Sequence, residues 1–287
     1  MTSAKTILVT GTSHGIGKLL ALTLASQGHN VYASMRGIHG KNAATSAELS
    51  QIAEEKGYRL QVVEMDITSD DSVTETIGKI EATHPIDVLI NNAGIMFVGI
   101  SEAFTVEQAK FQMDTNFYGV MRTSRAVLPG MRARKQGLLI HVSSNAGRIV
   151  VPYFGVYCAS KHAVEALVES YHYELAPFGI ESVIVEPGPH KTELVNTAPA
   201  PEDTACLDGY GAYADVPGQL LGHFKQMFEE QTDLTNPQNV ADTIAGLVNQ
   251  DGPRPIRTTV GSDFGVSEIN NFAAPIQKQL VDSLSGE

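Results

Sequence analysis

Short runs of apolar, often β-branched residues alternate along this chain with longer amphipathic segments. Nearly continuous apolar runs are typical of strands buried on both faces of a sheet. They predict strands over Thr6–Thr10, Asn30–Met35, Leu60–Met65, Ile86–Ile90, Leu138–Val142, Ile180–Glu186 and Thr258–Gly261. Apolar residues at helical spacing predict helices over Gly15–Gln27, Asn42–Lys56, Ser69–Thr83, Val106–Lys135, Gly155–Phe178, Leu220–Gln231, 236–249 and, in part, Val266–Leu284.

The alternation of strand and helix implies parallel strand pairing with right-handed crossovers. We therefore expect an α/β fold: a doubly wound, mostly parallel sheet of the Rossmann type, with helices on both faces. No segment separates two cores, so we expect one domain over residues 1–287. A stretch rich in Pro, Ala, Gly and Thr follows the sixth strand. We interpret residues 189–235 as a substrate loop or lid, because long loops in compact domains are usually functional or disordered.

Composition and charge narrow the setting and the partners. The chain is 43% hydrophobic and 18% charged, as in a globular protein, and no run of 18 apolar residues predicts a membrane span. The first strand begins too early to leave room for a signal segment. Two cysteines without zinc-like spacing favour a cytoplasmic protein with no metal site. A formal net charge of −12 argues against nucleic acid or an anionic membrane as a partner.

Three glycines, Gly11, Gly15 and Gly17, lie where the first strand ends and the first helix begins. Glycine allows the tight turn and lets backbone N–H groups approach a diphosphate at a helix N-terminus. The intervening Ser13, His14 and Ile16 belong to the same predicted dinucleotide site. A plain turn, with His14 a surface residue, is the alternative.

The residue after the second strand indicates which dinucleotide is bound. An acidic residue there would hold the ribose hydroxyls of NAD, but the chain has Arg36. Its guanidinium could bind a 2′-phosphate in bidentate fashion, so we expect NADP(H). The alternative is that Arg36 is a solvated loop residue.

Tyr157 and Lys161 are four residues apart on a predicted helix, which puts them on one face with β-carbons about 5–6 Å apart. A neighbouring ammonium is expected to lower the pKa of a phenol from its usual value near 10. The pair therefore suggests a proton donor for hydride transfer at a carbonyl. Ser144 follows an apolar strand at the edge of the sheet where such folds bind ligands, and could orient the substrate oxygen; helix capping is its alternative.

With these motifs in order, the chain resembles the short-chain dehydrogenase/reductase family in its single-domain form, and within it the hydroxysteroid and retinol dehydrogenase branch. The resemblance rests on Thr10–Gly17, Asn91-Asn92-Ala93-Gly94, Asn116, Ser144 and Tyr157-x3-Lys161. It implies a catalytic set of Asn116, Ser144, Tyr157 and Lys161, with Asn116 in a proton relay to Lys161. It also implies cofactor contacts from Asp66, Ile67, Asn92, Ala93, Gly94, Tyr157, Lys161, Pro187, Gly188 and Thr192. For Asn92–Gly94 a strand-terminating turn, and near Asp66 a helix cap, are the alternatives.

Apolar residues surround the expected carbonyl site, among them Met96 and Val151, which we assign to substrate binding with Ser144 and Tyr157. Leu207, Tyr210, Tyr213, Leu221, Phe224, Met227 and Phe228 of the long loop extend this apolar set. The expected function is an NADP(H)-dependent carbonyl reductase or alcohol dehydrogenase for a medium or bulky hydrophobic substrate. A nucleotide-sugar epimerase or dehydratase and a non-catalytic NADP(H)-binding regulator are the alternatives. The family resemblance further implies a homodimer or homotetramer.

Overall fold

The computed structural model describes residues 3–230 and 232–285. Within them, seven parallel strands form one sheet in the order β3-β2-β1-β4-β5-β6-β7. The strands are β1 (Thr6–Thr10), β2 (Asn30–Met35), β3 (Leu60–Glu64), β4 (Val88–Asn91), β5 (Gly137–Val142), β6 (Ile180–Pro187) and β7 (Arg257–Val260). The predicted fold class is confirmed, and the predicted strand bounds agree to within two residues.

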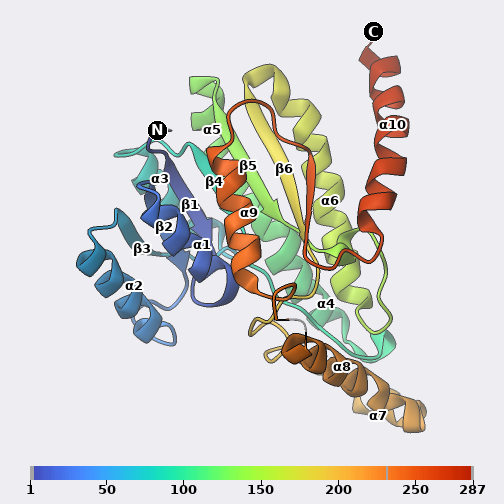
Figure 1. The fold of residues 1–287 in the computed structure, drawn as a ribbon. Coiled ribbons are helices and arrows are strands. Elements are labelled where there is room, and N and C mark those ends of the chain that lie inside the picture. Colours follow the sequence, from blue (N-terminus) through green and yellow to red (C-terminus); the bar gives the residue numbers. More distant parts are fainter. Residues whose placement is uncertain (1–2, 231, 286–287) are drawn as a thin grey trace.

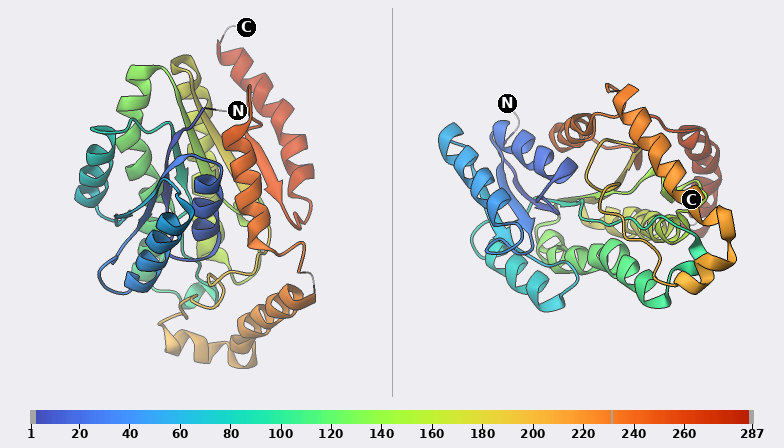
Figure 2. Two further views of the ribbon diagram at one scale, coloured as in Figure 1. Left: turned by 60° about the vertical axis from the view of Figure 1, so that its left-hand side comes forward. Right: turned by 90° about the horizontal axis from the view of Figure 1, so that it is seen from below.

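Helices cover both faces of this sheet, as the two layers in Figure 2 show. On one face the core joins the strands to α1 (Gly15–Ser26), α2 (Ala43–Lys56) and α9 (Pro237–Asn249). On the other it joins them to α3 (Asp70–Glu81), α5 (Gly119–Arg134) and α6 (Gly155–Leu175). The central strands are buried on both faces, which is why they read as nearly continuous apolar runs.

The long helix predicted over Val106–Lys135 is interrupted. It consists of α4 (Val106–Met113), a π-helical turn (Asp114–Tyr118) and α5. Thr105 and Gln108 start α4 with a capping box. A π turn inserts one extra residue into a helix and is frequent at functional sites. Here the turn contains Asn116, one of the residues expected to be catalytic.

The segment after β6 is more helical than its composition predicted. It contains α7 (Thr204–Gly209), a 3₁₀ turn (Gly211–Asp215) and α8 (Val216–Glu230), which lie beyond the ends of the strands (Figure 1). For α8, the predicted start at Leu220 is four residues late. Pro217 looks like a helix breaker, yet proline is accepted in the first turn of a helix. The predicted end of α8, Gln231, lies outside the described residues, as do Met1, Thr2, Gly286 and Glu287. The closing helix is α10 (Val266–Ser285).

Candidate active site

A cavity of about 590 Å³ lies among the loops that follow the strands. Of the residues predicted for the site, it is lined by Gly11, Ser13, His14, Gly15, Ile16, Gly17, Arg36, Asp66, Ile67, Asn92, Ala93, Gly94, Met96, Ser144, Val151, Tyr157, Lys161, Pro187, Gly188 and Thr192. Asn116 is the exception, because it lies behind the wall. Residues from six strand ends are thus brought together, as expected at the carboxyl edge of a doubly wound sheet.

The glycine turn at one end of the cavity is packed too closely for side chains. A β-carbon at Gly11 would lie 2.6 Å from Cα of Ala93, and Gly11 has φ of +70°. A β-carbon at Gly17 would lie 2.2 Å from the carbonyl oxygen of Gly11. The Asn92 amide donates to the carbonyl oxygens of Thr10 (2.9 Å) and Gly11 (3.1 Å). Asn92 therefore fixes the shape of this turn.

The first turn of α1 fits the diphosphate of a dinucleotide. No side chain caps this helix, and its first turn carries no acidic residue. Its free N–H groups and the positive end of its dipole favour an anion at the cavity wall formed by Gly15, Ile16 and Gly17. The His14 ring lies 2.7 Å from the Ser13 hydroxyl, so these two polar side chains contact each other at the rim.

Cations border the far end of the glycine turn. Arg36 lies 3.7 Å from the Asp66 carboxylate, and both side chains are partly exposed, at 41% and 34%. Lys41, which the sequence analysis missed, lines the same cavity. Burial acts to raise the pKa of Asp66, but hydrogen bonds from Thr68 and the charges of Arg36 and Lys41 outweigh it and lower that pKa. Two cations facing one ionised carboxylate leave this end of the cavity suited to a phosphate group.

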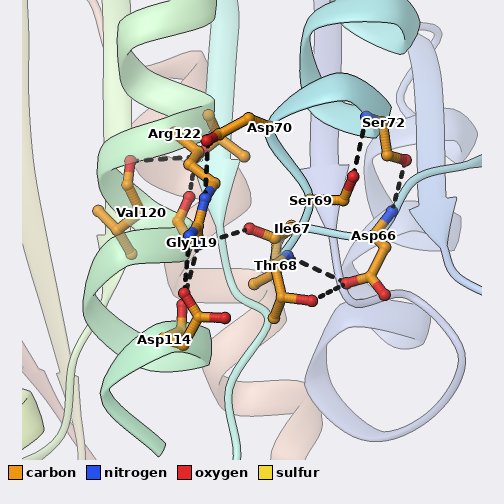
Figure 3. Close-up of polar contacts among 11 residues, drawn as sticks. Asp66, Ile67, Thr68, Ser69, Asp70, Ser72, Asp114, Gly119, Val120 and Arg122 are labelled. Atoms are coloured by element: carbon orange, nitrogen blue, oxygen red, sulfur yellow. Dashed lines mark hydrogen bonds and ion pairs between the residues drawn. The ribbon is translucent and has the colours of Figure 1, made fainter. Parts of the chain in front are cut away.

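The loop that carries Asp66 and Ile67 is held in place by Arg122 of α5 (Figure 3). The Arg122 guanidinium donates to Asp70 (2.8 Å), to Asp114 (2.7 Å) and to the Ile67 carbonyl oxygen (3.3 Å). The Asp66 side chain accepts from the Thr68 backbone and hydroxyl, while Ser69 caps α3. Ser69 thus provides the expected helix cap near Asp66, and Asp66 itself lines the cavity.

Tyr157 and Lys161 share one face of α6 as predicted, but the predicted acidification of the phenol is wrong for this structure. Burial raises the pKa of Tyr157 to about 12, against the lowering effect of a hydrogen bond with Ser144. Burial also lowers the pKa of Lys161 to about 8. The Lys161 ammonium lies 5.8 Å from the Tyr157 ring centroid and donates to the Val142 carbonyl (2.9 Å). Desolvation is therefore the largest influence on the pKa of both groups.

Ser144 and Asn116 lie near this pair, but only Ser144 is hydrogen-bonded to it. Ser144 is half-buried beside the phenol, and its hydroxyl also accepts from the Ala146 N–H (3.1 Å), so the capping alternative is present as well. The Asn116 side chain accepts from Ile95 N–H and donates to the Ile95 carbonyl and the Ser160 hydroxyl. A β-carbon on Gly94 would lie 3.3 Å from Asn116 Oδ1 and 3.8 Å from Lys161 Nζ. Asn116 and Lys161 thus face the same glycine.

The other end of the cavity is apolar. Met96, Val151 and Phe154 pack with Leu194, Val195 and Phe224, and the rings of Phe154 and Phe224 meet edge to face at 5.9 Å. Of the aromatic loop residues expected here, only Phe224 and Phe228 line the cavity, whereas Tyr213 is 71% exposed and Tyr210 donates to Glu102. Leu207, Leu221 and Met227 also lie off the wall. Phe264 lines it with φ of +51°, which no sequence signal indicated.

The described residues of the stretch 189–235 border the apolar end; they contact α4 at the middle of the stretch and one another near its two ends. The Gln108 side chain of α4 donates to the Ala200 carbonyl (2.9 Å) and accepts from Glu202 N–H (3.1 Å). Lys191 N–H donates to the Thr235 carbonyl, and the Lys191 ammonium pairs with Glu229 of α8, so the beginning and the end of the stretch contact each other.

Neither a metal-binding cluster nor a membrane-spanning helix is present in the part of the chain that the structure describes. It contains no cluster of three or more His, Cys, Asp or Glu side chains placed to bind a metal ion. None of its helices combines the length and apolarity that crossing a bilayer requires.

Comparison with known proteins gives the family. A sequence model described as short chain dehydrogenase matches residues 5–203. A 3-ketodihydrosphingosine reductase of Bacteroides thetaiotaomicron is 35% identical over 256 residues, covering 89% of this chain and 87% of that protein. Human retinol dehydrogenase 8 is 34% identical over 265 residues, covering 88% and 80%. The crystal structure of a short-chain dehydrogenase from Streptomyces avermitilis superposes with a TM-score of 0.77 at 27% identity, covering 99% of this chain and 100% of that one. This chain belongs to the short-chain dehydrogenase family and is an oxidoreductase that uses NAD(P)(H) and acts on alcohol or carbonyl groups.

Proposed function

We propose that this enzyme uses NADP(H) to reduce the carbonyl group of a medium-sized or bulky apolar ketone or aldehyde, or to oxidise the matching alcohol. The observation that supports this most strongly is the position of Tyr157. It lies in one cavity between a glycine turn suited to a dinucleotide and a wall of apolar side chains. Bound NADP(H) would supply or accept the hydride. The glycine turn, the first turn of α1, and the cations Arg36 and Lys41 would bind it.

The chain's own residues would move the proton. With its pKa raised to about 12, Tyr157 keeps its proton across the neutral range and is a general acid in the direction of reduction. As the carbonyl carbon gains the hydride, the phenol O–H bond breaks and the substrate oxygen takes the proton. Ser144 would orient that oxygen, and Lys161 would stabilise the phenolate that remains. Asn116, with its side chain fixed behind Gly94, would position Lys161 and the relay to it.

The preference for NADP(H) over NAD(H) rests on Arg36 and Lys41. Both cations border the cavity, where the extra phosphate of NADP(H) would form charge-assisted hydrogen bonds. We expect Arg36→Asp to weaken NADPH binding about 10–100-fold and to improve NADH binding, since each lost charged contact is worth about 1.5–3 kcal/mol. Fluorescence titration with both cofactors measures this. A wild-type protein that already binds NADH more tightly would contradict the proposal.

An apolar substrate is supported by the residues around Phe154 and Phe224. Two relatives are named for 3-ketodihydrosphingosine and for retinol, which agrees with an apolar substrate here. A ketone series of increasing alkyl length, with a keto acid as the charged control, should give a rising kcat/KM when NADPH absorbance is followed. We further infer a single domain in which residues 189–235 form a lid over this end, supported by the hydrogen bonds of Gln108 with Ala200 and Glu202.

Tyr157→Phe tests the catalytic assignment and the non-catalytic alternative together. It removes the proton donor and keeps the ring, so turnover should fall about 10²–10⁴-fold while the Kd of NADPH changes little. Turnover at the wild-type rate would exclude Tyr157 as the acid. A wild-type protein that binds NADPH but reduces no carbonyl compound would favour the regulator instead.

A further inference from the structure

A buried cluster of charges lies directly behind Lys161, and the proposed function does not use it. Glu165 follows Lys161 by one turn of α6, and its side chain is 3% exposed. Arg257 of β7 places its guanidinium 3.0 Å from Glu165 and 2.7 Å from Glu169, with the buried Glu186 of β6 at 3.6 Å. Burying so many charges is costly unless they are paired, so this arrangement calls for an explanation.

The ammonium of Lys161 is hydrogen-bonded to an uncharged group, a backbone carbonyl. It donates to the Val142 carbonyl, and the residue as a whole is 7% exposed. Glu165 is the carboxylate nearest to it along α6. Burial acts to lower the pKa of Lys161, and the negative charge of Glu165 acts to raise it.

The two oxygens of Glu165 have different surroundings. Oε2 accepts from Arg257 Nε at 3.0 Å. Oε1 borders Gly147, where an added β-carbon would lie 3.2 Å from it and 2.7 Å from the Ser143 hydroxyl of the cavity wall. One oxygen is thus held by a cation, while the other is directed toward the wall that also contains Ser144.

We propose that Glu165 is a positioning residue for catalysis: its carboxylate keeps Lys161 ionised within the cavity wall, and Arg257 keeps Glu165 ionised. The proposal rests on the proposed function, in which a cationic Lys161 stabilises the Tyr157 phenolate. The groups that face Glu165 are Lys161 and Glu169 from α6, Ser143 after β5, Arg148, Glu186 from β6 and Arg257 from β7.

These neighbours single out Glu165 as the anion that serves Lys161. Burial raises the pKa of Glu165 as well, but a Ser143 hydrogen bond and the Arg257 guanidinium act to lower it. Glu186 is less suited, because burial and the charge of Glu165 raise its pKa to about 7, and Asn270 binds one of its oxygens at 2.6 Å. Glu169 lies a further turn from Lys161 and is 22% exposed. Glu165 is both the closest of the three along the chain to Lys161 and firmly paired with a guanidinium.

The test compares Glu165→Gln with Glu169→Gln, since each removes one carboxylate partner of Arg257. The pKa of Lys161 is measured by NMR titration of its ε-carbon, assigned with Lys161→Met. Loss of an adjacent opposite charge should lower that pKa by about one unit in Glu165→Gln, and by much less in Glu169→Gln. The alkaline limb of the kcat/KM profile should move to lower pH by the same amount.

A purely structural role for Glu165 would change thermal stability but leave this titration in place. An unshifted Lys161 titration in folded Glu165→Gln protein would overturn the proposal. If the single variant fails to fold, the double variant Glu165→Gln with Arg257→Gln removes both members of the pair. Loss of the Arg257 cation then offsets part of the effect, so the pKa of Lys161 should fall by less than in the single variant, and an unchanged or raised pKa would overturn the proposal. Because the titration needs no turnover, a shifted pKa in a protein that reduces no carbonyl would refute the proposed function alone.

Discussion

Gly17→Ala sets helix propensity against packing at a crowded point of the site. Gly17 is in α1, and replacing glycine by alanine inside a helix is normally stabilising by about 1 kcal/mol. Here the new β-carbon would lie 2.2 Å from the Gly11 carbonyl oxygen and 2.4 Å from the Asn92 amide nitrogen. Those atoms would have to move by about 1 Å to restore van der Waals contact. Overpacking of this kind costs about 1–3 kcal/mol, so we expect a net loss of stability.

Gly78→Ala is the matched control. Gly78 is an exposed residue of α3, and a β-carbon there would meet nothing within 4 Å. Denaturant unfolding should show this variant to be more stable than the wild type by about 0.5–1 kcal/mol, and Gly17→Ala to be less stable by as much as about 2 kcal/mol, which is the packing cost less the gain in helix propensity.

Cofactor titration gives a second measurement on the same pair of proteins. The displaced turn should weaken NADPH binding at least about tenfold in Gly17→Ala, because the Asn92 contacts that shape it are strained. Gly78→Ala should bind as the wild type does. If the two variants were equally stable and bound NADPH equally well, the argument from close packing would be refuted.

Two further predictions concern groups outside the reacting centre. Arg122→Ala should lower the free energy of unfolding by about 1–2 kcal/mol and speed hydrogen exchange in residues 66–70, because the guanidinium ties that loop to α5; unchanged exchange there would contradict this. Glu186 has its pKa raised to about 7 from 4.5, so the folded state binds the extra proton and loses stability as pH rises between these values. Glu186→Gln should remove this pH dependence of the free energy of unfolding, which amounts to about 1–3 kcal/mol between pH 4.5 and 8. Denaturant unfolding across that pH range measures it, and a dependence that persists in the variant would belong to another group.

Much of the fold could be predicted because its signals are local. Strands buried on both faces, such as β1 and β5, leave continuous apolar runs, and the glycine turn follows the first of them. The π turn around Asn116 left no such signal, since one extra residue in a helix hardly changes apolar spacing. Pro217 suggested a break where a helix is present, because proline breaks a helix in its interior but is accepted in its first turn.

The site was predictable where motifs carry it and not where three-dimensional proximity decides. Lys41 follows Arg36 by five residues, and only the folded loop brings it to the cavity. The pKa of Tyr157 shows the same limit: spacing places Lys161 beside it, but spacing does not reveal how deeply both are buried. Phe264 reaches the cavity from the far end of the chain, with no pattern in its own surroundings.

The π turn between α4 and α5 has a consequence for how this protein could diverge. Such a turn is one residue more than a regular helix needs, so the flanking helices could keep their packing if that residue were lost. What would change is the placement of Asn116 against Ile95 and Ser160. At this point of the chain a single deletion could therefore abolish activity while leaving the architecture whole, and relatives that have lost catalysis could carry it without any sign of instability.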